Sequence, residues 1–66
     1  MKNKIAQLRK ERNLTQQMLA EQLTVSRQTV ISLENGRYNP SLGLAYRIAK
    51  VFDCSIEEVF LFEEEE

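Results

Sequence analysis

The stretch LTQQMLAEQLTVSRQTVISLENG, residues 14–36, decides how the rest of the chain can fold. Its first half predicts a short helix over residues 15–23, with a polar outer face. Three apolar residues at helical spacing give this helix its inner face: Leu19, Ala20 and Leu23. Thr15 is placed to cap it, because a threonine hydroxyl can accept from a free amide of the first turn. Val25 then breaks the pattern, and we expect it to fill the corner that follows.

A second helix follows this corner, and both of its ends are marked in the sequence. Ser26 is the N-cap candidate, and Asn35 and Gly36 form the stop, because glycine takes the left-handed cap conformation at least cost. Val30 and Leu33 are expected to point inward. The remaining side chains form a polar outer face that carries a cation: Arg27, Gln28, Thr29, Ile31 and Ser32. The stretch therefore predicts two short helices joined by a tight turn.

The flanking sequence adds three further helices at the same apolar spacing. The first should cover residues 3–12, and the fourth residues 42–52 after a cap at Ser41. The fifth should begin near Ile56, because Ser55 and Glu58 match a capping box. The inner face of the fourth helix is expected to contain these residues: Leu42, Ala45, Ile48, Ala49 and Phe52. With one proline and two glycines in 66 residues, an all-α bundle is favoured over a sheet.

Length and composition predict one small intracellular domain. Residues 1–62 are expected to form it, and residues 63–66 an acidic C-terminal tail. The single Cys54 cannot form an internal disulfide, and no apolar run approaches the roughly 18 residues of a membrane span. The charged N-terminus does not resemble a signal peptide. We therefore expect a cytoplasmic protein without a membrane association.

The net charge of −1 hides an electrical division of the chain. All nine Lys and Arg residues lie within residues 1–52, where only three Glu oppose them, which leaves a balance of +6. Residues 53–66 contain seven acidic residues and no cation. A polyanionic partner is therefore compatible with the first part of the chain, although the overall composition is slightly acidic.

The order and spacing of these elements resemble the helix-turn-helix of the phage repressor and Cro-like family. This family, also called the xenobiotic-response-element family, consists of small prokaryotic transcriptional regulators. The residues that carry the resemblance are Leu14, Thr15, Gln16, Leu19, Ala20, Val25, Ser26, Thr29, Val30, Leu33, Glu34, Asn35, Gly36, Pro40, Ser41 and Leu42. The resemblance extends over residues 3–60. It implies an all-α, five-helix, lambda-repressor-like DNA-binding domain, and leaves open a short β-ribbon between the chain ends.

On this resemblance, the helix that starts at Arg27 reads DNA bases in the major groove. The guanidinium of Arg27 suits the two acceptors of guanine, and the Gln28 amide can both accept from and donate to adenine. Thr29, Ile31 and Ser32 extend the same face, and the Ile31 side chain or the Thr29 methyl could pack on a thymine methyl. An ordinary solvated helix face is the alternative for these residues.

Phosphate contacts are expected on either side of that helix. Gln16 begins the preceding helix, where free amides and the helix dipole favour an anion. The resemblance implies that this glutamine also supports the Arg27 side chain. Four residues after the reading helix could bind phosphates through side chains or loop amides: Asn35, Arg37, Tyr38 and Asn39. For Tyr38, a ring lying on the edge of the core is the alternative.

The resemblance also implies a structural ion pair between Glu34 and Arg9. Such a partly buried pair would fix the angle between the first helix and the reading helix. Arg9 would then be no DNA contact. A solvated surface glutamate at position 34 is the alternative reading.

An enzymatic function is not supported by the residue types present. The chain has no histidine, one cysteine, no glycine-rich phosphate loop and no metal-ligand cluster, so we expect no catalytic residue, metal or cofactor and no small-molecule ligand. The function expected is that of a sequence-specific DNA-binding transcriptional regulator, a repressor, acting on double-stranded DNA. The alternative is a protein-interaction module, such as an antitoxin or adaptor, with a vestigial DNA face.

One helix-turn-helix reads only a few base pairs, so we expect a homodimer on a pseudo-palindromic operator with half-site centres ~34 Å apart. Val59, Phe60 and Phe62 are the predicted dimer interface, with Leu44 or Tyr46 as possible additions. The alternative is that these residues only close the core of the monomer.

Overall fold

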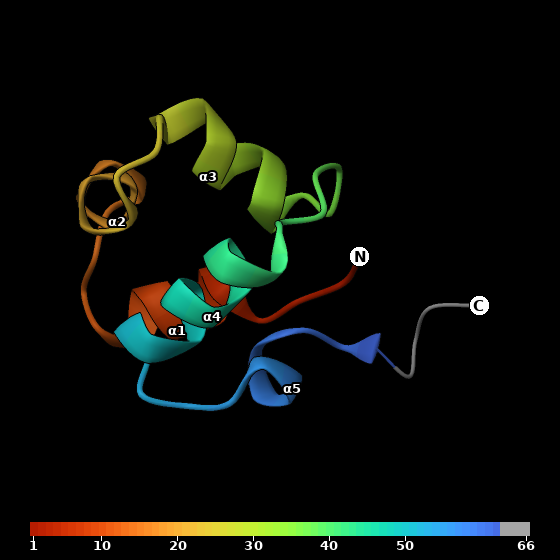
Figure 1. Cartoon of the computed structure of the whole chain (residues 1–66). Coiled ribbons are helices and arrows are strands. Elements are labelled where there is room, and N and C mark those ends of the chain that lie inside the picture. Colours follow the sequence, from red (N-terminus) through yellow and green to blue (C-terminus); the bar gives the residue numbers. More distant parts are fainter. Residues whose placement is uncertain (63–66) are drawn as a thin grey trace.

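The computed structural model describes residues 1–62, in which five helices are joined by short turns (Figure 1). In chain order they are α1 (Ile5–Glu11), α2 (Gln16–Leu23), α3 (Arg27–Glu34), α4 (Leu42–Val51) and α5 (Ile56–Val59). The predicted all-α, five-helix fold is therefore confirmed. Among the described residues, no helix has both the length and the apolar character needed to cross a bilayer. The glutamates at positions 63–66, predicted to be an acidic tail, lie outside the described residues.

Hydroxyl side chains cap four of the five helices, as predicted from the sequence. Each accepts a hydrogen bond from the backbone amide three residues further on: Thr15 from Met18, Ser26 from Thr29, Ser41 from Leu44, and Ser55 from Glu58. The predicted capping box at the start of α5 is complete, because the Ser55 amide also donates to Glu58 Oε1 at 2.7 Å. These caps satisfy amides that a helix leaves free at its N-terminus.

The turns after the helices use the left-handed backbone conformation. Gly36 has a φ of 75°, as expected for the residue that stops α3. Three other residues have positive φ values of 55–58°: Asn13, Thr24 and Asp53. Asn13 and Asp53 tolerate this conformation better than most residues, because their short polar side chains can bond locally. Thr24 does not, and its strained backbone marks the corner between α2 and α3.

The start of α1 differs from the prediction. The helix begins at Ile5 and not at Asn3, because the residues before it are extended along the C-terminal segment. Lys4 N donates to the Val59 carbonyl at 2.8 Å, and Leu61 N donates to the Lys2 carbonyl at 2.9 Å. Within residues 1–62 these contacts give one antiparallel bridge, between Asn3 and Phe60, and not a longer β-ribbon.

One core gathers the apolar faces of all five helices. Its thirteen buried residues are Ile5, Leu19, Ala20, Leu23, Val30, Leu33, Leu44, Ala45, Ile48, Ala49, Phe52, Val59 and Phe60. The prediction for α4 was wrong at one position, because Leu42 is 79% exposed and Leu44 is buried in its place. Leu42 is the first residue of α4 and lies beyond the region that the other helices cover. Val25 packs against the core at the corner, as expected.

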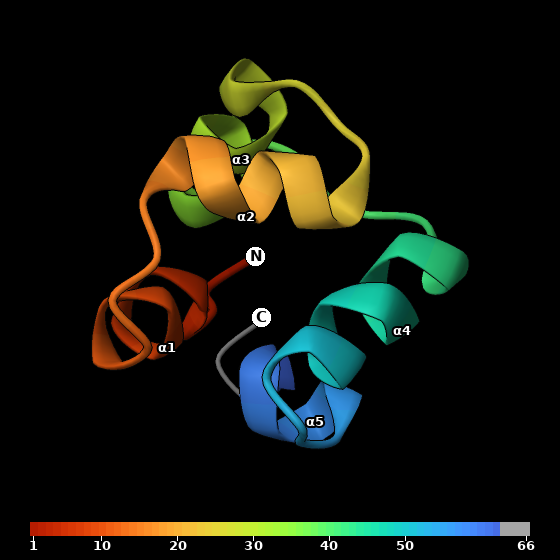
Figure 2. The ribbon, with the colours of Figure 1, turned by 90° about the vertical axis from the view of Figure 1, so that its left-hand side faces the viewer.

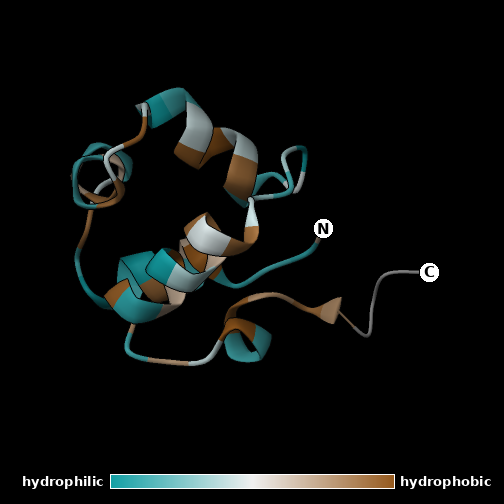
Figure 3. Cartoon of the chain, in the orientation of Figure 1, coloured by the Kyte–Doolittle hydropathy of each residue, from teal (hydrophilic) through white to brown (hydrophobic). Residues whose placement is uncertain are grey.

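The helices are arranged so that the first turn of α3 lies at the outer edge of the molecule. α3 packs against α2 and α1, while α4 packs against α2 and α5. Figure 2 shows α2 and α3 on one side, with α1, α4 and α5 on the other. In Figure 3 the apolar side of α3 turns inward, and its polar start faces outward. The described residues therefore leave the start of α3 accessible to a large partner.

Candidate nucleic-acid interface

The corner between α2 and α3 is tightly held by the backbone. Thr24 ends α2 in the left-handed conformation, and Val25 N donates back to the Ala20 carbonyl at 3.0 Å. Ser26 then caps α3, and its Oγ also lies 2.9 Å from Thr29 Oγ1. Because the corner is fixed by these bonds and by the buried face of α3, the direction of the first turn of α3 is fixed as well.

The predicted base-reading residues divide into two groups on α3. Arg27 and Gln28 are exposed, whereas Thr29, Ile31 and Ser32 are only half-buried. A surface hollow contains members of both groups together with the cap of α3 and a residue of the loop that follows it: Ser26, Gln28, Thr29, Ser32 and Tyr38. Arg27 instead lies on the side of α3 that faces α2, where its guanidinium meets Gln16. Ile31 does not line the hollow.

Tyr38 lies beside the outer face of α3, because it lines this hollow together with residues of that face. The side chain is 46% exposed and lines the same depression as Gln28 and Ser32. Almost half of the side-chain surface is open here, so Tyr38 is accessible from outside the domain.

A chain of side-chain hydrogen bonds links α1, α2 and the start of α3. Arg9 Nε donates to Glu34 Oε2 at 2.7 Å, and their side chains are only 11% and 8% exposed. The ion pair implied by the family resemblance is therefore present. Glu34 Oε1 also accepts from Gln16 Nε2 at 3.1 Å, and Gln16 Oε1 accepts from Arg27 Nη2 at 3.3 Å. The bond between Glu34 and Gln16 was not foreseen.

Arg9 has a further partner that binds it to the polypeptide backbone. Its Nη1 donates to the Leu14 carbonyl at 2.9 Å, in the turn between α1 and α2. Arg9 is therefore bound to partners within the fold. Two other arginines, both exposed, donate to backbone carbonyls at helix C-termini: Arg12 to Phe52 and Arg47 to Leu23.

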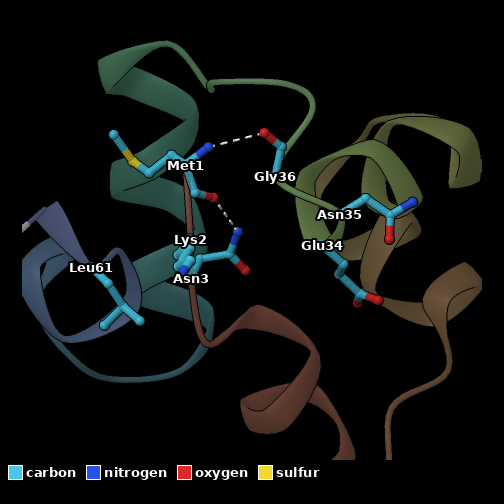
Figure 4. Close-up of a pocket in the computed structure, with 7 residues that line it drawn as sticks. All are labelled: Met1, Lys2, Asn3, Glu34, Asn35, Gly36 and Leu61. Carbon is cyan, nitrogen blue, oxygen red and sulfur yellow. Dashed lines mark hydrogen bonds between the residues drawn. The ribbon is translucent and has the colours of Figure 1, made fainter. Parts of the chain in front are cut away.

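The loop after α3 is supported by the first residues of the chain (Figure 4). The Met1 amine donates to the Gly36 carbonyl at 2.9 Å, and Asn3 Nδ2 donates to the Leu33 carbonyl at 2.8 Å. Asn39 Oδ1 lies 3.5 Å from the same amine. The four residues predicted to bind phosphates on this loop have exposed side chains: Asn35, Arg37, Tyr38 and Asn39. No sequence pattern indicated this support, because its partners are 30 or more residues apart.

Within residues 1–62, the carboxylates of α5 lie away from the start of α3. Arg27 is exposed at the start of α3 and Arg37 in the loop after it, whereas the exposed Glu57 and Glu58 lie on α5. Figure 1 shows α3 and α5 on opposite sides of the molecule. A polyanion approaching α3 would therefore meet cations before it meets these carboxylates.

The three residues predicted to form the dimer interface differ in their exposure. Val59 and Phe60 are 0% and 2% exposed and belong to the core cluster, in line with the alternative that they close the core of the monomer. Phe62 remains 48% exposed, and Leu42 is the most exposed large apolar residue. Both line a groove that also contains Pro40, Ala45 and Ile56.

The comparisons with known proteins agree with this geometry. A family model described as helix-turn-helix matches residues 5–59. A helix-turn-helix-type transcriptional regulator of Methanocaldococcus jannaschii is 53% identical over the whole length of both chains. The transcriptional activator BcrR of Enterococcus faecalis is 43% identical over 92% of this chain and 30% of its own length. An immunity repressor protein of Bacillus phage phi105 is 38% identical over 85% of this chain and 39% of its own length.

The match covers all five helices, including the corner at Thr24, the capped start of α3 and the pair of Arg9 with Glu34. The chain therefore belongs to the Cro/C1-type helix-turn-helix family of DNA-binding transcriptional regulators.

Proposed function

We propose that the protein is a sequence-specific repressor that binds a pseudo-palindromic operator as a homodimer, through α3. The observation that carries the proposal is the exposed first turn of α3, on which Arg27 is held by Gln16 while Gln28 is free. An arginine held in one direction loses less conformational entropy on binding than a free one. The Arg27 side chain is thus positioned before DNA arrives.

In the proposed complex, the first turn of α3 enters the major groove. Arg27 spends one Nη2 hydrogen on Gln16 and keeps four other N–H donors, enough for the two acceptors of guanine. Gln28 reads adenine, and Thr29 and Ser32 contact neighbouring bases from the same hollow. Ile31, being half-buried, offers only its outer edge to a thymine methyl.

Phosphates are proposed to lie at both ends of the reading helix. Gln16 is the first residue of α2, where free backbone amides attract an anion. Since the Gln16 side chain is occupied by Glu34 and Arg27, its contribution would come from the backbone. At the other end, the exposed loop supplies Asn35, Arg37, Tyr38 and Asn39.

The dimer is proposed to form through the groove that contains Leu42 and Phe62, with a second copy of the chain as its occupant. The groove includes Asn39, the last residue of the loop proposed to bind phosphates, and continues through Pro40. A two-fold axis here places the two loops near the operator centre and the two α3 helices further out. The domain measures 31 × 22 × 20 Å, a size that suits two neighbours on successive turns of one DNA face, ~34 Å apart.

Leu42→Glu tests this interface without disturbing the fold. Position 42 is the first residue of α4 and is 79% exposed. A glutamate in the first turn of a helix interacts favourably with the positive end of the helix dipole. Sedimentation should show a dimer for the wild type, and a monomer for Leu42→Glu and Phe62→Glu. Met18→Glu, at a partly exposed apolar residue of α2, is the control that should remain dimeric. Unchanged dimers in both groove variants would refute the interface.

Repression is the proposed outcome because a protein that occupies a promoter excludes polymerase without needing a further contact. The phage relative is named a repressor, and the named activator is a much longer protein of which this chain matches 30%. In vitro transcription from a promoter that contains the selected operator should fall as the protein is added. A rise in transcription would instead show that the protein is an activator.

DNA binding itself is tested by mobility shifts with matched variants. Arg27→Ala and Gln28→Ala should each lose about 1–3 kcal/mol on the preferred site and little on random DNA. Lys10→Ala and Gln7→Ala remove one cation and one amide from exposed positions of α1 and should retain the preference. Affinity should also fall steeply with salt. Binding that is insensitive both to salt and to Arg27→Ala would favour the protein-interaction alternative.

A further inference from the structure

We infer that Glu34 is a positioning residue for base reading: it decides which end of the Gln16 amide faces Arg27, and so sets the direction of the Arg27 guanidinium. The inference rests on the proposed function of Arg27. It gives Glu34 a part in DNA selectivity, in addition to its structural ion pair with Arg9.

Only one arrangement of hydrogen bonds matches donors with acceptors among the side chains of Glu34, Gln16 and Arg27. An ionised carboxylate only accepts hydrogen bonds, so Glu34 can face only the amino end of the Gln16 amide. The Gln16 Nε2 to Glu34 Oε1 distance of 3.1 Å is that bond. The carbonyl end of the same amide is then turned the other way, where it accepts from Arg27 Nη2 at 3.3 Å. A guanidinium only donates, so the arrangement is matched at both ends.

Arg9 keeps Glu34 in this acceptor role. It donates to both carboxylate oxygens, through Nε to Oε2 at 2.7 Å and through Nη2 to Oε1 at 3.4 Å. Glu34 is mostly buried, so its carboxylate has little freedom to turn away from these partners. The direction of Gln16 is therefore set from inside the domain, by a side chain that DNA does not touch.

The substitution Glu34→Gln should reverse the orientation of the Gln16 amide, with little change in the shape of the side chain at position 34. The amide oxygen of the new side chain is needed by Arg9, so its amino group is left to face Gln16. Gln16 then turns its own oxygen inward and presents an amino group to Arg27, donor against donor. Arg27 loses its support and is free to sample directions that do not fit guanine.

The experiment compares base discrimination at the position that Arg27 reads, as the ratio of affinities for the preferred base and its substitutes. Glu34→Gln should lower this ratio at least about fivefold, the worth of one net hydrogen bond. Gln16→Met, which removes both bonds and leaves the ion pair intact, should lower it equally. Glu11→Gln is the matched control, because Glu11 accepts from Gln7 at 3.3 Å in the same way, on exposed α1. Its ratio should stay at the wild-type value.

Two further measurements separate positioning from a general loss of stability. Affinities of all variants are measured at a temperature where melting curves show them folded. If Glu34→Gln does not fold, Gln16→Met still tests the inference. In an Arg27→Ala background, Glu34→Gln should no longer change discrimination at that base pair. Equal losses on all sequences, or an unchanged ratio in Gln16→Met, would overturn the inference. If the wild type shows no base preference, the proposed function fails instead.

Discussion

Replacing Arg9 by methionine should strongly destabilise the domain, because it leaves a buried carboxylate without its cation. The Glu34 side chain is 8% exposed and would keep only the bond from Gln16. Removing one partner of a buried pair costs about 3–5 kcal/mol. A domain of this length has a total stability of roughly 3–10 kcal/mol, at about 0.05–0.15 kcal/mol per residue. Arg9→Met should therefore remove a large part of the free energy of unfolding.

The assay is chemical and thermal unfolding followed by circular dichroism. For a domain of this size, each kcal/mol shifts Tm by about 4–8 °C, so Arg9→Met should lower Tm by roughly 12 °C or more. The double variant Arg9→Met with Glu34→Leu removes both charges together, and should recover most of the loss. The reasoning would be refuted if Arg9→Met lost less than about 1 kcal/mol, the value of an exposed pair.

Three smaller effects follow from individual backbone and cap positions. Gly43 lies in α4 with open space where a Cβ would be, so Gly43→Ala should raise the free energy of unfolding by about 0.4–1 kcal/mol in urea titrations. Gly36→Ala should lower it by about 1–2 kcal/mol, because φ is 75° and the new Cβ would lie 3.1 Å from the Met1 carbonyl oxygen. Hydrogen bonds from the backbone and side chain of Ser55 lower the pKa of Glu58. Its contribution to stability should be present above the usual glutamate pKa of about 4.3 and disappear as pH falls through the lowered value. Comparing the acid-range unfolding of wild type and Glu58→Gln checks this, and identical pH profiles would contradict it.

Local features of the fold were predictable because their causes lie within a few residues. The caps at Thr15, Ser26 and Ser41 each need only a hydroxyl and an amide three positions away. The stop at Gly36 needs only a residue that tolerates the left-handed conformation. The pair of Arg9 with Glu34 spans 25 residues, and it was foreseen only through the family resemblance.

Features that depend on several elements at once could not be read from periodicity. Helical spacing places Leu42 on the same face as Ala45 and Ala49 without saying where the core ends, and in the structure Leu42 is exposed whereas Leu44 is buried. The sequence does not show whether Val59 and Phe60 belong to the core or to the surface. In the structure both are buried, because the extended N-terminal segment binds the end of α5 through backbone hydrogen bonds and holds it against the core.

Within the site, the sequence predicted which residues face outward but not how they are held. Arg27 and Gln28 are exposed as expected, and Tyr38 lines the same hollow as Gln28. The bond of Gln16 to Glu34 could not be predicted, because it depends on the placement of the start of α2 relative to the end of α3. Neither sequence spacing nor residue type encodes that distance.

The most direct test of base reading by α3 is selection of bound sequences from random duplex DNA, carried out in parallel with wild type and Arg27→Ala. The wild type should enrich a pseudo-palindrome with half-site centres about 10 base pairs apart. Arg27→Ala should keep that spacing and lose the preference at one base pair in each half-site. The claim would be contradicted by the same motif from both proteins, or by no enrichment with the wild type.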